Sequence, residues 1–208
     1  MNALLEAAAP LFASAFAFRG APVTWLEIVA FALAIAMVVA NIRVAPVAWP
    51  LAIASSLLYF LLFWQSRLYG EASLQILFVA VAFWGWWQWL RGTDATGRAL
   101  RVRALSTRGL AIGLAALALA WPALALFLDR FSDSDVPWLD ALPTAGSVLG
   151  QWLLAKKFFE NWPVWLAVNV ASVVLFAIKG LWLTVLLYAV FVVMSGFGWR
   201  AWRRLARP

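Results

Sequence analysis

Few side chains inside the long apolar stretches of this 208-residue sequence could do chemistry. The sequence holds no His and no Cys, which excludes thiol catalysis, His-based metal sites and Ser-His-Asp arrangements. The polar residues within the stretches are amides and hydroxyls, namely Ser55, Ser56, Gln75, Gln151, Asn169, Ser172, Thr184 and Tyr188. Such groups recognise a ligand by hydrogen bonding but pair no nucleophile with a base. We therefore expect no enzyme, no metal and no cofactor.

Two tryptophans add a second kind of contact close to one of these amides. Trp162 and Trp165 precede Asn169 by one to two helical turns, and residues 165 and 169 share a helix face because they are four apart. An indole ring there could stack on a flat aromatic ligand and attract a cation. The alternative roles are structural, with Trp in a belt at the membrane interface and the amide bonded to a neighbouring helix. The sequence leaves both interpretations open.

The elements that must position these residues are membrane-spanning helices. Hydrophobic residues make up 66% of the chain and charged residues 12%, which is more apolar surface than a soluble domain can bury. Seven stretches are long enough for a helix to cross about 30 Å of hydrocarbon, and they cover residues 23–41, 46–65, 71–90, 109–128, 138–155, 162–178 and 181–199. The first 18 residues are also apolar but are interrupted by Pro10, so we expect an interfacial helix there, with an additional span as the alternative. The predicted fold class is an all-α integral membrane protein.

Basic residues indicate the orientation of the chain. Five arginines follow the third stretch, namely Arg91, Arg98, Arg101, Arg103 and Arg108, which predicts that this segment is cytoplasmic. Alternation of the stretches then places twelve of the sixteen Lys and Arg inside, with the N-terminus outside and the C-terminus in the cytoplasm. Orientation thus explains the net charge of +7, and we expect no nucleic-acid partner.

The sequence also contains an internal repeat with an offset of 113 residues. Without a gap, this offset superposes Trp25-Leu26-Glu27 on Trp138-Leu139-Asp140, Trp49-Pro50 on Trp162-Pro163, and Gly85-Trp86 on Gly198-Trp199. It also pairs Ser56 with Asn169 and Gln75 with Tyr188. Matches of Trp, Pro and Gly at one offset are not a by-product of apolar composition, so they indicate a duplication.

An odd number of spans per repeat requires one extra helix between the repeats if both are to face the same way. We divide the chain into an N-terminal interfacial segment (1–22), a first three-helix repeat (23–91), a connecting region (92–137), a second three-helix repeat (138–204) and a basic tail (205–208). The connecting region contains a basic cytoplasmic loop, a linker helix and an acidic outer loop. Two parallel repeats in a 3+1+3 arrangement form a transporter architecture, with the substrate site between them near the middle of the membrane.

One run of the second repeat resembles a motif of the PnuC-type vitamin transporters, E-N-W-x-x-W-x-x-x-N-x-x-S. Here it reads Glu160-Asn161-Trp162-Pro163-Val164-Trp165, followed by Asn169 and Ser172; Leu68-Tyr69, Gln75 and Gly85-Trp86-Trp87-Gln88-Trp89 match other parts of the family pattern. The resemblance covers residues 25–92 and 138–204. It implies a SWEET-like fold, a homo-oligomer such as a trimer, and a multi-pass protein surrounded by the lipid of a bacterial inner membrane.

The resemblance also implies a cargo and a site. Gln75 and Asn169 become the first candidates for substrate contact, followed by Trp165, Trp162, Tyr188, Ser56 and Ser172. Nicotinamide riboside is the first choice of substrate, and thiamine or riboflavin is the alternative, because aromatic and amide side chains could serve any of them. A substrate-binding subunit of an ATP-driven vitamin importer is a further alternative.

The acids of the predicted spans bear on how transport is driven. Glu27 and Asp140 are the only acids inside the stretches, both lie near the outer surface, and we expect them to cap helix starts rather than couple ions. The sequence therefore predicts facilitated diffusion, with the vitamin retained by phosphorylation in the cytoplasm.

Overall fold

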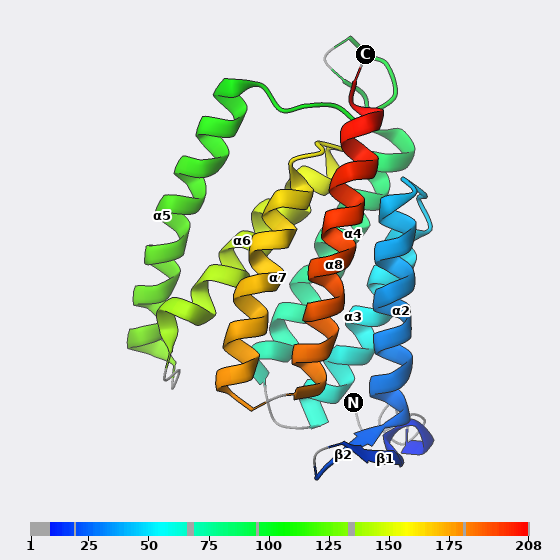
Figure 1. Cartoon of the computed structure of the whole chain (residues 1–208), viewed down its shortest axis with the longest axis vertical. Helices are drawn as coiled ribbons and strands as arrows, with labels where there is room; N and C mark the ends of the chain where they lie inside the picture. The colour runs from blue at the N-terminus through cyan, green and yellow to red at the C-terminus, as the bar shows by residue number, and fades with distance from the viewer. Residues whose placement is uncertain are drawn as a thin grey trace. The chain divides into compact units, whose positions relative to one another are not determined.

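The computed structural model describes residues 9–18, 20–65, 69–94, 96–132, 136–180 and 182–207. These residues form seven α-helices, namely α2 (Trp25–Ile42), α3 (Ala48–Gln65), α4 (Tyr69–Arg91), α5 (Thr107–Phe131), α6 (Pro137–Ala155), α7 (Asn161–Ile178) and α8 (Trp182–Leu205) (Figure 1). Each helix coincides with one predicted stretch to within about six residues, so the prediction of a helical membrane protein is confirmed.

Four of these helices are long and apolar enough by themselves to cross a membrane: α2, α5, α7 and α8. A shorter apolar helix covers Ala48–Leu62 within α3. The other two, α4 and α6, contain polar and small residues such as Gln88 and Gln151, which lower their mean hydropathy. Such residues are tolerated in a span when they face other helices rather than lipid.

The N-terminal segment differs from the expected interfacial helix. Residues Ala9–Phe12 form a 3-10 helix, and an antiparallel hairpin follows, made of β1 (Ser14–Phe18) and β2 (Ala21–Thr24). The prediction of a helix is therefore wrong for residues 14–18, while residues 1–8 lie outside the described part. The alternation of small residues with Phe in β1 has the period of a strand, and Gly20 turns the chain at φ +87°.

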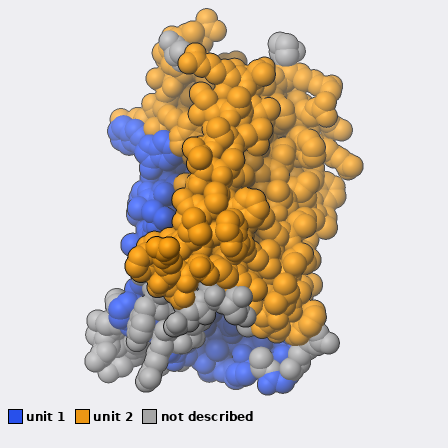
Figure 2. Space-filling view, turned by 90° about the vertical axis from the view of Figure 1, so that its left-hand side faces the viewer, with its two compact units in different colours: residues 1–87 blue, residues 88–208 orange. Residues whose placement is uncertain are grey.

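The chain divides into two compact units, residues 1–87 and 88–208, coloured separately in Figure 2. The first unit holds the hairpin, α2, α3 and most of α4. Within it α2 packs along α3, and the buried Ser55 hydroxyl of α3 donates to the Ala30 carbonyl of α2 at 3.2 Å. Trp49 of α3 is buried against Gly85 of α4, where an added Cβ would overlap the indole ring.

The second unit holds α5 to α8 and the basic loop before α5. Sequential helices pack on one another, and α7 and α8 run side by side (Figure 1). Gly146 and Gly150 lie one helical turn apart on α6 and face Val168 and Trp165 of α7. The missing side chains let α6 approach α7 closely, which is the usual role of small residues four apart in membrane helices.

Each unit contains the same helix-to-helix turn. The φ angle is +56° at both Val44, after α2, and Lys157, after α6, and these residues are 113 apart. The backbone hydrogen bonds of the two turns also correspond, namely Val44 N to Asn41 O (3.0 Å) with Lys157 N to Leu154 O (3.0 Å), and Ala45 N to Ala40 O (2.9 Å) with Phe158 N to Leu153 O (2.9 Å). Both turns end a helix with a left-handed residue, as Schellman-type caps do. This local correspondence is the one that the 113-residue repeat predicts.

Candidate functional site

The motif found in the sequence lies on α7 and on the turn that precedes it. The residues that α7 buries fall within one arc of the helix at 100° per residue, namely Asn161, Trp162, Val168, Asn169, Ser172 and Leu175. One face of the helix therefore carries four of the motif's polar and aromatic side chains toward neighbouring helices.

Asn169 connects the middle of α7 to α8. Its Nδ2 donates to the Ser195 hydroxyl at 3.1 Å, and that hydroxyl donates to the Phe191 carbonyl at 2.7 Å. Both side chains are buried, with 4% of Asn169 and 2% of Ser195 exposed. The amide nitrogen of Asn169 therefore forms a structural hydrogen bond between α7 and α8. Within the described residues the side-chain oxygen, Oδ1, accepts no hydrogen bond, which leaves it an acceptor for a ligand.

The two tryptophans of the motif contact different helices. Trp162 is 3% exposed and fills the space beside Gly198 of α8, with its ring edge-on to Trp202 at 5.8 Å. Trp165 is half-buried and lies over Gly150 of α6, where an added Cβ would stand 3.1 Å from its ring. Trp162 is therefore a packing residue by its surroundings, whereas Trp165 keeps part of its ring open.

The remaining candidates of the second unit lie on α7 and α8. Ser172 is 2% exposed, one turn beyond Asn169. Tyr188 is half-buried between two phenylalanines, with ring centroids 5.2 Å from Phe176 and 5.8 Å from Phe191. Phe191 also provides the carbonyl that accepts from Ser195, so the amide pair and the aromatic cluster are adjacent on α8.

Gln75 and Ser56 belong to the first unit. Gln75 is half-buried on α4, and Ser56 is half-buried on α3 beside the buried Ser55. The structure thus gathers five of the seven predicted site residues in the second unit and two in the first. The Ser55 hydroxyl donates to the backbone of α2, so it has a structural partner.

The first two residues of the motif shape the turn before α7. Glu160 Oε1 accepts from the Leu105 backbone N–H at 2.9 Å, and Asn161 Nδ2 donates to the Phe158 carbonyl at 2.6 Å. Arg103 continues the contact through backbone hydrogen bonds of 3.1 Å to Lys157 O and from Phe159 N. The basic loop is therefore fixed to the turn between α6 and α7.

Lys157 holds the same loop from within the turn. Its Nζ donates to the Leu100 carbonyl at 3.1 Å and lies 5.0 Å above the Trp89 ring. Burial lowers the pKa of this ammonium group. A favourable hydrogen bond and an aromatic face compensate in part for the desolvation of the charge.

Sequence reasoning missed Ser195 and the docking of the loop. Ser195 lies three residues before Gly198 on the same buried face of α8, and that spacing was the available signal. The contacts of Glu160 with Leu105 and of Lys157 with Leu100 join residues more than fifty positions apart, for which a single sequence gives no signal.

The acids at the starts of α2 and α6 have local partners. Glu27 forms a capping box with Thr24, its Oε2 accepting from the Thr24 N–H at 2.7 Å while Thr24 Oγ1 accepts from the Glu27 N–H at 3.2 Å. Asp140 forms an ion pair with Lys179 at 3.4 Å. The expected capping role is confirmed for Glu27. In the described part of the chain no group of His, Cys, Asp or Glu could hold a metal ion.

Apolar helices long enough to span a membrane, with uncharged polar side chains buried between them, define a helical integral membrane protein. The family described as nicotinamide mononucleotide transporter matches residues 24–204, and the chain belongs to this family, the PnuC transporters. The resemblance inferred from the motif is confirmed.

Individual relatives are consistent with this assignment. The chain is 31% identical over 205 residues to the riboflavin/roseoflavin transporter RibM of Streptomyces davaonensis, with 95% of each chain covered. It is 28% identical over 174 residues to the nicotinamide riboside transporter PnuC of Escherichia coli, covering 72% of this chain and 73% of that one. The crystal structure of the vitamin B3 transporter PnuC superposes with a TM-score of 0.72 at 25% identity, over 88% of this chain and 82% of that chain. The protein is a vitamin transporter of the PnuC family.

Proposed function

We propose that this transporter moves riboflavin by facilitated diffusion and that Asn169 binds the vitamin. The observation that carries this proposal is the open carbonyl oxygen of Asn169, in the middle of an apolar helix and one turn from the partly exposed ring of Trp165. An amide acceptor beside an indole suits a flat aromatic ring that carries N–H groups. Ser172 and Tyr188 extend the same region of the second unit.

The choice of riboflavin over other vitamins has its own support. The riboflavin transporter is similar to this chain over 95% of its length, whereas the similarity to the E. coli nicotinamide riboside transporter covers 72%. Nicotinamide riboside, the first choice from the sequence alone, is the second candidate because that relative still shares 28% identity. Thiamine, the third vitamin considered, serves as a comparison in the tests below.

The arrangement we propose has two parallel three-helix repeats, α2 to α4 and α6 to α8, joined by α5. Gln75 and Ser56 then complete the site from the first repeat, at positions that correspond to Tyr188 and Asn169. A site shared by two equivalent repeats can open to either side of the membrane in turn. The charge distribution supports an N-terminus outside and a C-terminus in the cytoplasm, in an inner membrane.

The driving force that we propose for transport follows from the positions of Glu27 and Asp140. Glu27 caps its own helix and Asp140 pairs with Lys179, so both have structural partners outside the apolar middle of the spans. Flow is then driven by the vitamin gradient alone, and a cytoplasmic kinase retains the product. Vesicles containing the protein, a flavokinase and ATP should accumulate labelled riboflavin, and Glu27→Gln and Asp140→Asn should transport at the wild-type rate. Accumulation driven by a proton or sodium gradient without the kinase contradicts this mechanism.

Calorimetric titration of the purified protein with riboflavin, nicotinamide riboside and thiamine tests the substrate. Tight binding of riboflavin, weakened by Asn169→Ala and unchanged by Trp199→Ala on the exposed face of α8, supports the proposal. Tight binding of nicotinamide riboside with weak binding of riboflavin reverses the order of the two candidates. Binding that Asn169→Ala leaves unchanged removes Asn169 from the site.

A further inference from the structure

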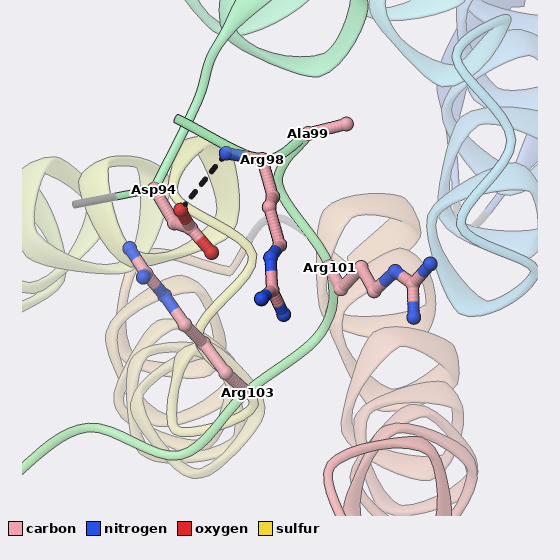
Figure 3. Close-up of a pocket in the computed structure, with 5 residues that line it drawn as sticks. All are labelled: Asp94, Arg98, Ala99, Arg101 and Arg103. Carbon is pink, nitrogen blue, oxygen red and sulfur yellow. Dashed lines mark hydrogen bonds between the residues drawn. The ribbon is translucent and has the colours of Figure 1, made fainter. Parts of the chain in front are cut away.

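The basic loop between α4 and α5 borders an open hollow of about 210 Å³ lined by Asp94, Arg98, Ala99, Arg101 and Arg103 (Figure 3). The guanidinium groups of Arg98 and Arg103 and the carboxylate of Asp94 face this space. In Figure 3 the side chains of Arg98 and Arg103 extend toward the same space beside Asp94, while Arg101 points away from them. The excess of basic residues in cytoplasmic loops explains why this loop contains many arginines. It does not explain why Arg98 and Arg103 extend toward the same space.

The walls of the hollow are held by the backbone. Asp94 N donates to Arg98 O at 2.8 Å and Gly97 N to Asp94 O at 3.1 Å, and the turn passes through Gly97 at φ +78°. On the other side, Arg103 is fixed by its backbone bonds to the turn before α7, and its guanidinium lies 4.7 Å above the Phe158 ring. The backbone of the hollow and the position of the Arg103 guanidinium are thus set before any ligand arrives.

The side chains leave their donors available. In the part of the chain that the structure describes, the guanidinium groups of Arg98, Arg101 and Arg103 donate no hydrogen bond, and the Arg103 Nε is buried without a partner. Asp94, by contrast, has accepted bonds from Thr96 N at 2.8 Å and Thr96 Oγ1 at 2.6 Å. Buried donors without partners favour the binding of an acceptor.

The charges specify the class of that acceptor. The bonds from Thr96 lower the pKa of Asp94, so its carboxylate stays ionised at neutral pH, and with the guanidinium groups of Arg98 and Arg103 it leaves the hollow with a net charge of about +1. A phosphate monoester carries about −1.5 to −2 at this pH and three acceptor oxygens, which suit planar guanidinium donors. We propose that this hollow binds the phosphate group of a soluble phosphate compound or of an anionic lipid. This proposal does not depend on which vitamin is transported.

Two variants separate the hollow from general positive charge. Arg98→Gln removes the exposed guanidinium group that faces the hollow, and Arg203→Gln removes an exposed one from the last turn of α8. The full chain is used in each case, and both variants should keep the circular dichroism and elution volume of the wild type because the two side chains are exposed.

Two probes distinguish the sources of phosphate. The first is labelled inorganic phosphate, measured by equilibrium dialysis against the protein in a neutral detergent at low salt. The second is the phosphatidic acid, a lipid whose headgroup is a phosphate monoester, that the protein retains after purification from vesicles of phosphatidylcholine and phosphatidic acid. Binding of inorganic phosphate that the hollow variant weakens about tenfold and the α8 variant leaves unchanged supports a soluble ligand. Retention of phosphatidic acid that only the hollow variant loses supports a lipid ligand. If the two variants bind both probes equally, or the wild type binds neither, the proposal is wrong.

Discussion

The indole of Trp162 occupies the space that a side chain at Gly198 would fill. The same relationship joins Trp49 to Gly85 in the first unit, and each of these residues lies 113 positions before its counterpart. Both tryptophans are buried, with 3% of Trp162 and 1% of Trp49 exposed. In each unit a large ring against a glycine therefore fixes two helices to each other, α3 to α4 in the first and α7 to α8 in the second.

Replacing either glycine should destabilise the protein. In Gly198→Ala and Gly85→Ala the new methyl group overlaps the ring, and such overpacking costs about 1–3 kcal/mol. Gly196→Ala is the matched control because an added Cβ there meets nothing within 4 Å, so helix propensity alone should stabilise α8 by up to about 1 kcal/mol. Thermal unfolding in detergent measures all three. Equal melting temperatures for Gly196→Ala and Gly198→Ala would contradict the packing described here.

Variants of Asn169 and Ser195 should distinguish the structural hydrogen bond between α7 and α8 from a direct contact with the vitamin. Ser195→Ala and Asn169→Ala both remove the interhelical hydrogen bond, which is worth about 0.6 kcal/mol in membrane proteins. Only Asn169→Ala removes the open carbonyl oxygen, so it alone should weaken vitamin binding by about tenfold or more. Calorimetry and thermal unfolding on both variants provide the comparison. Equal loss of affinity in the two variants would show that the bond positions α8 and that the amide does not touch the vitamin.

Trp165 should contribute by stacking. Trp165→Ala is expected to weaken vitamin binding by about 0.5–1.5 kcal/mol, and Trp165→Phe should restore most of that affinity because a flat ring is kept. Trp199→Ala, on an exposed part of α8, should leave binding unchanged. Affinity as low in Trp165→Phe as in Trp165→Ala would argue that the indole acts through its contact with Gly150 instead.

Lys157 should control access to the basic loop. Lys157→Met removes the bond to Leu100 O and the contact with the Trp89 ring. The loss is about 1–2 kcal/mol, so cleavage by trypsin after Arg98 and Arg101 should become roughly 5–30 times faster. Lys179→Met, which breaks the ion pair with Asp140, is the control and should leave that rate unchanged. A rate in Lys157→Met equal to the control rate would show that other contacts hold the loop.

Much of the fold could be predicted because membrane helices follow from length and apolarity. All seven helices were located, and the left-handed residues after α2 and α6, Val44 and Lys157, are separated by the same 113 positions as the sequence matches. The N-terminal hairpin was missed because an apolar run with alternating Ala and Phe satisfies both a helix and a strand. Its strand pairing depends on the turn at Gly20, a local conformation that apolarity does not report.

The site was predictable in part. The motif located Asn169, Trp162 and Trp165 on one helix, but it could not assign their neighbours. Trp165 and Asn169 share a face by spacing, yet one contacts α6 and the other α8, because α7 lies between those helices. Ser195 was missed since a serine in a span bonds its own helix more often than it receives a bond from another.

Uptake of labelled vitamin into sealed vesicles containing only this protein, with no ion gradient, tests the central claim most directly. We predict that riboflavin equilibrates across the membrane far faster than in empty vesicles and stops at equal concentrations inside and outside. Asn169→Ala should slow this flux, and Gly196→Ala should not. Absence of flux for riboflavin, nicotinamide riboside and thiamine alike, in vesicles whose protein is folded, would contradict facilitated vitamin transport by this chain.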